Sequence, residues 1–186
     1  MKRGFKSWAD KKAIEYRKLL GKKYFDLLSA RELANYLEIE IITPRQIPGL
    51  KSDDASILLN DDHNSWSAIT IKNHSNSFII ISNPTHSGKR QESDLMHEIA
   101  HIVCEHKMEK IKLRTDFPYP LRDYNTQQEE EAKWLGGCLQ IPRNALVHML
   151  YKGLDISELS EHFGASLDMV RYRINITGVK KQFNKY

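Results

Sequence analysis

The sequence is poor in cysteine and has no long apolar run. Its two cysteines, Cys104 and Cys138, form no CxxC pair, so we expect reduced thiols rather than a disulfide framework. No stretch approaches the roughly 18 apolar residues of a membrane-spanning helix, and the charged N-terminal residues lack the apolar core of a signal peptide. Internal repeats and low-complexity tracts are also missing. These absences predict a soluble, cytoplasmic protein with no membrane partner.

Basic and acidic residues are nearly balanced, at 28 and 24. The formal net charge is only +4 over 186 residues, which is mild for a dedicated nucleic-acid-binding protein. Hydrophobic residues make up 40% and charged residues 28%, as in ordinary globular proteins. The length predicts one domain over residues 1–186.

Three short segments have the composition of β-strands. Residues 38–42 alternate between charged and apolar side chains, and residues 66–72 and 78–82 are rich in isoleucine. The last two are joined by residues 73–76, which favour a turn. We therefore predict a small antiparallel sheet, one edge of which could pair with an extended peptide.

Most of the remaining chain has helical spacing. A helix is predicted over 8–20, and Ser29 with Glu32 forms a capping-box pattern that opens a second helix. Residues 44–64, with Pro44, Pro48 and Gly49, are predicted to be a surface loop. The fold class is thus α+β and mostly helical.

The strongest chemical signal is the motif His97-Glu98-Ile99-Ala100-His101. It lies in a run without proline or glycine whose apolar residues have helical spacing, so both histidines fall on one face, about one turn apart. Two imidazoles so placed can bind one Zn²⁺ at about 2.0–2.1 Å. Glu98 points about 100° away, where it can act as a general base toward metal-bound water. In a chain with eight histidines the pattern arises by chance in about a few per cent of sequences, so a third ligand is needed to support it.

A third histidine is not the expected ligand. The pattern HExxHxxGxxH requires glycine at 104 and histidine at 107, where this chain has Cys104 and Lys107, and His106 falls one residue short. A carboxylate from a later helix would instead complete an open, catalytic His₂Glu site.

Such a helix is predicted over 127–139, after a connector at 107–125 and with Thr126 as N-cap. It carries Glu129, Glu130 and Glu131, which point about 100° apart, so that at most one can face a given metal. Glu129 shares its face with the small residues Ala132 and Gly136, whereas Glu131 shares its face with Trp134 and Cys138. The helical wheel leaves the choice between Glu129 and Glu131 open, and acidic residues also suit a solvated helix N-terminus.

Residues 154–176 are predicted to form two helices around a turn at Gly164, an arrangement that resembles a helix-turn-helix. Arg171 and Arg173 would then lie on the helix that could contact nucleic acid. A packed helical hairpin that completes the core explains the same pattern, and the mild basicity of the chain favours it.

Taken together, these segments resemble the ImmA/IrrE family of zinc metallopeptidases. The resemblance rests on HEIAHIVCEH followed by EEEAKWLGGCLQIPRNAL, and it extends to residues 29–37 upstream and 162–173 downstream. It implies a gluzincin-like fold, zinc ligands at His97, His101 and Glu129, and a general base at Glu98. Two positions depart from the family pattern: Ala100 replaces a usual glycine, and Lys133 replaces a usual Asn or Asp.

The resemblance also implies a function. Members of the family are proteases that cut helix-turn-helix repressors, so a protein substrate of that kind is expected. Two alternatives from other classes are a DNA-binding regulator with a non-catalytic zinc site, and a scaffold that binds a repressor without cutting it. Only the protease requires Glu98 to activate water. An oxyanion donor is also expected, and the sequence does not rank the candidates, which are His148, His162, Arg171, Tyr172 and Arg173.

Overall fold

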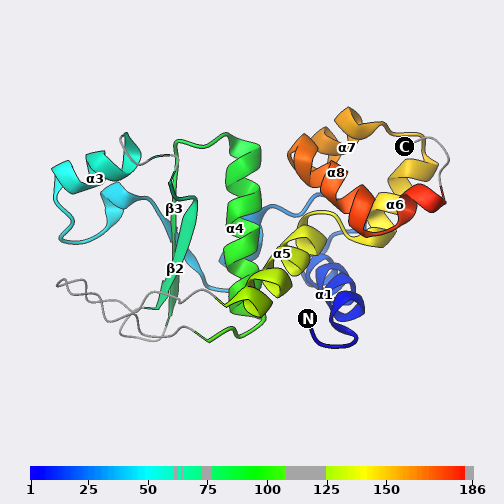
Figure 1. Ribbon diagram of the computed structural model, residues 1–186, viewed down its shortest axis with the longest axis horizontal. Helices are drawn as coiled ribbons and strands as arrows, with labels where there is room; N and C mark the ends of the chain where they lie inside the picture. The colour runs from blue at the N-terminus through cyan, green and yellow to red at the C-terminus, as the bar shows by residue number, and fades with distance from the viewer. Residues whose placement is uncertain (61–62, 64, 73–76, 108–124, 183–186) are drawn as a thin grey trace.

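The computed structural model describes the whole chain except residues 61–62, 64, 73–76, 108–124 and 183–186. Helices predominate over a small sheet, as Figure 1 shows, and the α+β class predicted from the sequence is confirmed. The elements are α1 (Phe5–Leu19), α2 (Ala30–Tyr36), β1 (Glu40–Ile42), the 3₁₀ helix η1 (Pro44–Gln46), α3 (Ser52–Leu59), β2 (Ala68–Lys72), β3 (Phe78–Ser82), α4 (Gly88–Val103), α5 (Thr126–Gln140), α6 (Arg143–Tyr151), α7 (Ile156–Phe163), α8 (Leu167–Ile176) and η2 (Val179–Lys181).

The three described strands form a mixed sheet in the order β1-β3-β2. Strand β2 runs antiparallel to β3, with Thr70 opposite Ile80, but β1 runs parallel to β3, with Ile41 opposite Ile80. The prediction of an antiparallel sheet was therefore wrong for β1. Alternation of side chains determines which face is buried but not the direction of the partner strand, and a long connection between β1 and β3 lets the chain return in the same direction.

The segment predicted as a surface loop contains helix α3. Asp53 and Asp54 lie in its first turn, where their charges favour the helix dipole, and Ala55 and Leu59 are buried. Proline and glycine before residue 50 thus mark the start of a short helix rather than a continuous loop.

Helix α2 begins differently from the predicted capping box. The Ser29 hydroxyl accepts a hydrogen bond from the Arg31 N–H at 3.2 Å, but Glu32 forms an ion pair with Lys22 at 3.0 Å instead of completing the box. The N–H of Ala30 donates to Glu92 of α4 at 2.7 Å. A side chain of the motif helix therefore satisfies a free N–H at the start of α2 and joins the two helices.

Helices α4 and α5 pack unusually closely, because α5 has glycine at the contact. A Cβ atom on Gly136 would lie 3.1 Å from the carbonyl oxygen of Met96 and 3.2 Å from the N–H nitrogen of His97. Ala132 on the same helix is fully buried. The small residues noted in the sequence thus let the start of α5 come near the two histidines of α4.

Two buried arginines hold the C-terminal end of α5. The Arg17 guanidinium donates to the carbonyls of Gln140, Ala13 and Asp26 at 3.0, 3.1 and 2.9 Å. Arg173 donates to the carbonyl of Ile141 at 2.9 Å and forms an ion pair with Asp10 at 3.3 Å. These contacts join α1 and α8 to the last turn of α5, where carbonyl groups otherwise lack intrahelical donors.

Helices α6–α8 form a separate apolar cluster at the end of the molecule opposite the sheet (Figure 1). Gly164 joins α7 to α8 in the left-handed conformation, with φ of 59°, at the predicted turn. Of the helices in the described residues, none is both long and apolar enough to cross a membrane.

Candidate metal centre

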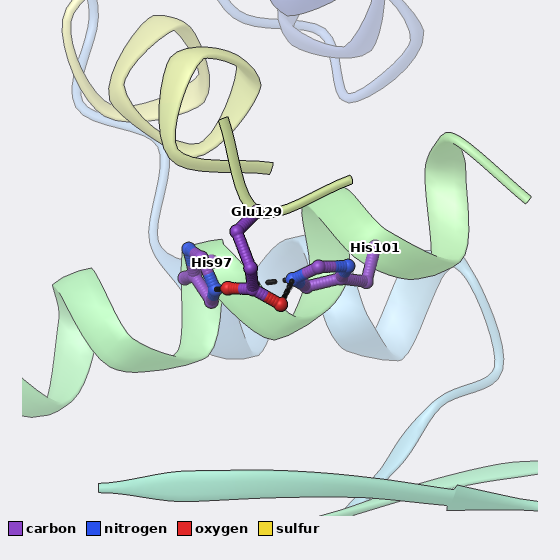
Figure 2. Close-up of side chains that lie close together, drawn as sticks. All are labelled: His97, His101 and Glu129. Carbon is purple, nitrogen blue, oxygen red and sulfur yellow. Dashed lines mark hydrogen bonds and ion pairs between the residues drawn. The ribbon is translucent and has the colours of Figure 1, made fainter. Parts of the chain in front are cut away.

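Three side chains converge where α4 meets the first turn of α5. His97 and His101 come from α4 and Glu129 from α5, and Figure 2 shows the carboxylate between the two imidazole rings. The Nε2 atoms of the histidines lie 3.1 Å apart. Glu129 Oε2 lies 3.1 Å from His97 Nε2, and Oε1 lies 3.4 Å from His101 Nε2. Within the described residues, this is the group of His, Cys, Asp and Glu side chains that could hold a metal ion.

These separations match a tetrahedral metal site. Ligand atoms bound to Zn²⁺ at about 2.0–2.1 Å with tetrahedral angles lie about 3.3 Å from one another. The three observed separations, 3.1, 3.1 and 3.4 Å, are close to that value. Two nitrogens and a carboxylate form the donor set of catalytic zinc sites, in which a fourth position stays open. The residues therefore fit a zinc ion.

The three side chains differ in how far they are exposed, and a cavity reaches two of them. The side chain of His101 is 3% exposed, whereas those of His97 and Glu129 are 30% and 22% exposed. A cavity of about 420 Å³ lies against His97 and Glu129, between α4 and α5 and next to Met169 of α8. Water or a substrate group can thus reach the centre from this side.

Glu131, the other carboxylate that the sequence left open, lies elsewhere. Its Oε2 is 3.3 Å from Nε2 of His106, and Gln127 donates to its Oε1 at 3.2 Å. Burial raises the pKa of Glu131, but hydrogen bonds from Gln127, His106 and the Lys2 N–H outweigh it and lower the pKa below its ordinary value. Glu131 therefore serves as an acceptor for these donors, and Glu129 is the carboxylate beside the two histidines.

Glu98 is not among the three converging side chains and contacts the sheet instead. It is 6% exposed, and its Oε2 accepts a hydrogen bond from the Thr70 hydroxyl of β2 at 2.5 Å. This placement agrees with the 100° offset between neighbouring helical positions. It puts a buried carboxylate between the histidine helix and strand β2, which is an edge of the described sheet.

Comparison with known protein families identifies the family of this chain. The family model of the IrrE N-terminal-like domain (Peptidase_M78) matches residues 54–175. The chain belongs to the IrrE N-terminal-like peptidase family. The match covers most of the sequence and includes both histidines, Glu98 and Glu129. No curated protein and no solved structure matches the chain.

Membership of the IrrE-like family supports a peptidase, and the donor set supports a metal-dependent one. Lys133 lines the cavity and lies with its Nζ 5.1 Å from the centre of the Tyr172 ring. It therefore contributes a positive charge to the cavity wall.

Most of the oxyanion candidates lie away from the cavity. His162 Nε2 contacts the carbonyl of Phe25 at 2.8 Å, and His148 stacks on the Phe25 ring. Arg173 is fully buried, and Arg171 is exposed and paired with Asp168. Tyr172 is the candidate next to the cavity wall, since its half-buried ring lies 5.1 Å from Nζ of Lys133, which lines the cavity.

Sequence reasoning missed two residues of this site. His106 was set aside because it does not fit the three-histidine pattern, yet its ring contacts His101. A third histidine soon after the motif was the available signal. Thr70 gave no signal, since its contact with Glu98 spans 28 positions of the sequence and depends on how the sheet packs on α4.

Proposed function

We propose that this protein is a zinc-dependent endopeptidase that uses Glu98 as its general base. The observation that supports this most directly is the tetrahedral spacing of His97, His101 and Glu129 in a chain of the IrrE-like peptidase family. A closed structural site would have four protein ligands, whereas among the described residues three converge beside a cavity.

The proposed chemistry is the addition of water to a peptide bond. A bound zinc ion would polarise the scissile carbonyl and lower the pKa of bound water toward about 7. Glu98 would take a proton from the attacking water and deliver it to the nitrogen of the leaving amine, so that the carboxylate is restored at the end of the cycle. Thr70, through its hydrogen bond, would hold the Glu98 carboxylate in one orientation.

The substrate would bind in an extended conformation near β2. This strand is an edge of the described sheet, and it lies on the side of α4 that carries Glu98. Backbone groups at a sheet edge can pair with a peptide strand, which would hold the scissile bond alongside the centre. Resemblance to the ImmA/IrrE peptidases supports a helix-turn-helix repressor as the substrate. Peptidase and repressor would then share the cytoplasm.

The DNA-binding alternative has less support from the structure. It relied on Arg171 and Arg173, but Arg173 is fully buried against Ile141 and Asp10. Arg171 alone remains exposed, in an ion pair with Asp168. One exposed arginine on α8 is a weak basis for contacts with a phosphate backbone.

The test compares wild type with Glu98→Gln. Each protein is incubated with the repressor encoded beside its gene, with zinc content measured in parallel. We expect Glu98→Gln to keep its zinc and bind the repressor but to cut it about 10²–10⁴-fold more slowly, because Gln cannot accept the proton. Cleavage by Glu98→Gln at the wild-type rate would overturn the assignment of Glu98 as the general base. No cleavage by wild type, together with loss of sequence-specific DNA binding in Arg171→Ala, would end the peptidase proposal.

A further inference from the structure

His106, which lies just beyond the C-terminal end of α4, contacts one of the candidate metal ligands. Its Nδ1 lies 2.8 Å from Nδ1 of His101, and the two ring centres are 4.9 Å apart. On its other side, Nε2 of His106 lies 3.3 Å from Oε2 of Glu131. His101 in turn directs its Nε2 toward His97 and Glu129. A continuous chain of contacts thus leads from Glu131 through His106 to the candidate metal position.

The chemistry of these groups determines which atom donates and which accepts in each of these contacts. The Glu131 carboxylate accepts from Gln127 Nε2 and from the Lys2 N–H, at 3.2 and 3.4 Å, so it acts as an acceptor toward His106 as well. His106 then carries its hydrogen on Nε2 and accepts at Nδ1, because a neutral imidazole has one donor and one acceptor nitrogen. His101 must donate from Nδ1 to that acceptor. This leaves the lone pair of His101 Nε2 pointing at the position where a metal would bind.

The three side chains are shielded from water. They are 3%, 6% and 9% exposed for His101, His106 and Glu131. In a buried site a ring nitrogen without a partner is costly, so His101 has a strong reason to keep the tautomer that donates to His106. Removal of His106 would take away the group that determines this tautomer.

The backbone at the end of α4 brings His106 to this position. Glu105 adopts φ of 53°, a left-handed conformation that residues other than glycine adopt rarely. The N–H of His106 then donates to the carbonyl of His101 at 3.1 Å, so that the chain turns back. Glu38 ends α2 with a similar φ, so the conformation alone marks no site. At Glu105 its consequence is that the rings of His101 and His106 meet.

We propose that Glu131 and His106 are a positioning pair, which holds His101 with its hydrogen on Nδ1 and the lone pair of Nε2 directed at the metal position. The inference rests on the proposed metal-binding role of His101. Metal-bound histidines commonly donate their second ring nitrogen to a carboxylate or carbonyl, and loss of that partner typically lowers metal affinity about 10- to 100-fold. Here a second histidine transmits the effect of the carboxylate to the ligand.

The first test reads the tautomer in the metal-free protein. Long-range proton–nitrogen NMR correlations on ¹⁵N-histidine protein should show His101 with its hydrogen on Nδ1 and His106 with its hydrogen on Nε2. In His106→Phe, His101 should lose this single form. His101 with its hydrogen on Nε2 in wild type, or an unchanged His101 in His106→Phe, would overturn the proposal. This measurement involves neither zinc nor substrate, so it stands even where no peptidase activity is found.

The second test measures zinc affinity by competition with a fluorescent chelator. We expect His106→Phe and Glu131→Leu to bind zinc about 10- to 100-fold more weakly than wild type. Glu131→Gln keeps an acceptor oxygen and should lose less than Glu131→Leu. Matched controls are Glu130→Gln, at a neighbouring exposed residue, and His63→Phe, on the turn after α3; both should bind as wild type.

The outcomes separate the two proposals. Wild-type zinc affinity in a folded His106→Phe protein would overturn the positioning pair and leave the peptidase proposal intact. If His106→Phe does not fold, as judged by circular dichroism, the comparison of Glu131→Leu with Glu131→Gln decides, and equal affinity in these two variants and wild type would overturn the pair. If the variants bind zinc more weakly than wild type but wild type cuts no repressor, the positioning pair is supported and the proposed substrate is contradicted.

Discussion

The hydroxyl group of Thr70 lies 2.5 Å from Oε2 of Glu98, and this hydrogen bond joins strand β2 to the helix that carries the two histidines. Both residues are buried, at 5% and 6% exposed. Because an ionised carboxylate can only accept, the hydroxyl is the donor. The bond therefore restricts how the proposed general base can turn.

The contact predicts a specific effect on rate. In Thr70→Val the side chain keeps its shape but has no donor, so we expect kcat to fall about 10- to 100-fold while zinc content stays unchanged. Thr70→Ser keeps the hydroxyl and should retain most of the activity. Steady-state kinetics and metal analysis on both variants provide the check, and a Thr70→Val enzyme with the wild-type kcat would show that the bond has no part in catalysis.

Metal content should distinguish the three consecutive glutamates of α5. We expect about one zinc per wild-type chain, removable by chelator, and little or none in His97→Ala, His101→Ala or Glu129→Ala. Glu130→Ala is the matched control, because that side chain is 58% exposed. Inductively coupled plasma mass spectrometry gives the stoichiometry. If Glu131→Ala loses all of its zinc while Glu129→Ala keeps it, the proposed ligand is wrong.

The close approach of α4 and α5 predicts that Gly136 cannot be replaced without cost. An added Cβ would meet backbone atoms of Met96 and His97, which cannot move aside as a flexible side chain could. We expect Gly136→Ala to lower the free energy of unfolding by about 1–3 kcal/mol and to weaken zinc binding by moving Glu129 away from the histidines. Urea denaturation and chelator competition measure the two effects.

A matched control for this substitution is Gly88→Ala. Gly88 lies at the start of α4, has no positive φ, and has open space where a Cβ would be. It should retain wild-type stability within about 0.5 kcal/mol. Equal stability of Gly136→Ala and Gly88→Ala would contradict the packing argument.

The buried thiols predict how stability depends on pH. Burial, as the main cause, raises the pKa of Cys138 to about 12, whereas an unfolded thiol titrates near 8.5. The folded state therefore keeps its proton where the unfolded state loses it. This contribution to stability is complete below about pH 8.5 and is lost progressively as the pH rises toward 12.

Two measurements check this prediction. The free energy of unfolding, from denaturant titrations between pH 7.5 and about 10, should decrease as pH rises, and by less in Cys138→Ala relative to its own value at pH 7.5. Alkylation of Cys138 by iodoacetamide at pH 8 should be far slower in the native state than in denaturant, because the thiolate is the reactive form. Rapid alkylation of native Cys138 would mean that the thiol is not held protonated.

The local elements could be predicted from sequence because their causes are local. The period of apolar residues marked strands β2 and β3 and the helix around His97, and Gly164 marked the turn between α7 and α8. The i, i+4 spacing of His97 and His101 put both rings on one face of α4 by helix geometry alone. Errors occurred at caps and short elements, such as α3 and the start of α2, where a few side-chain contacts decide the conformation.

The order of residues was enough to predict the pair of histidines on one helix and the period of the elements around it. Packing between elements accounts for three further features: β1 pairs parallel to β3, Glu129 rather than Glu131 meets the two histidines, and Arg173 is buried. The physical reason is that spacing along the chain places side chains on a face of one element. Which face meets which neighbour depends on packing between distant segments, here on the contact between Gly136 and the backbone of α4.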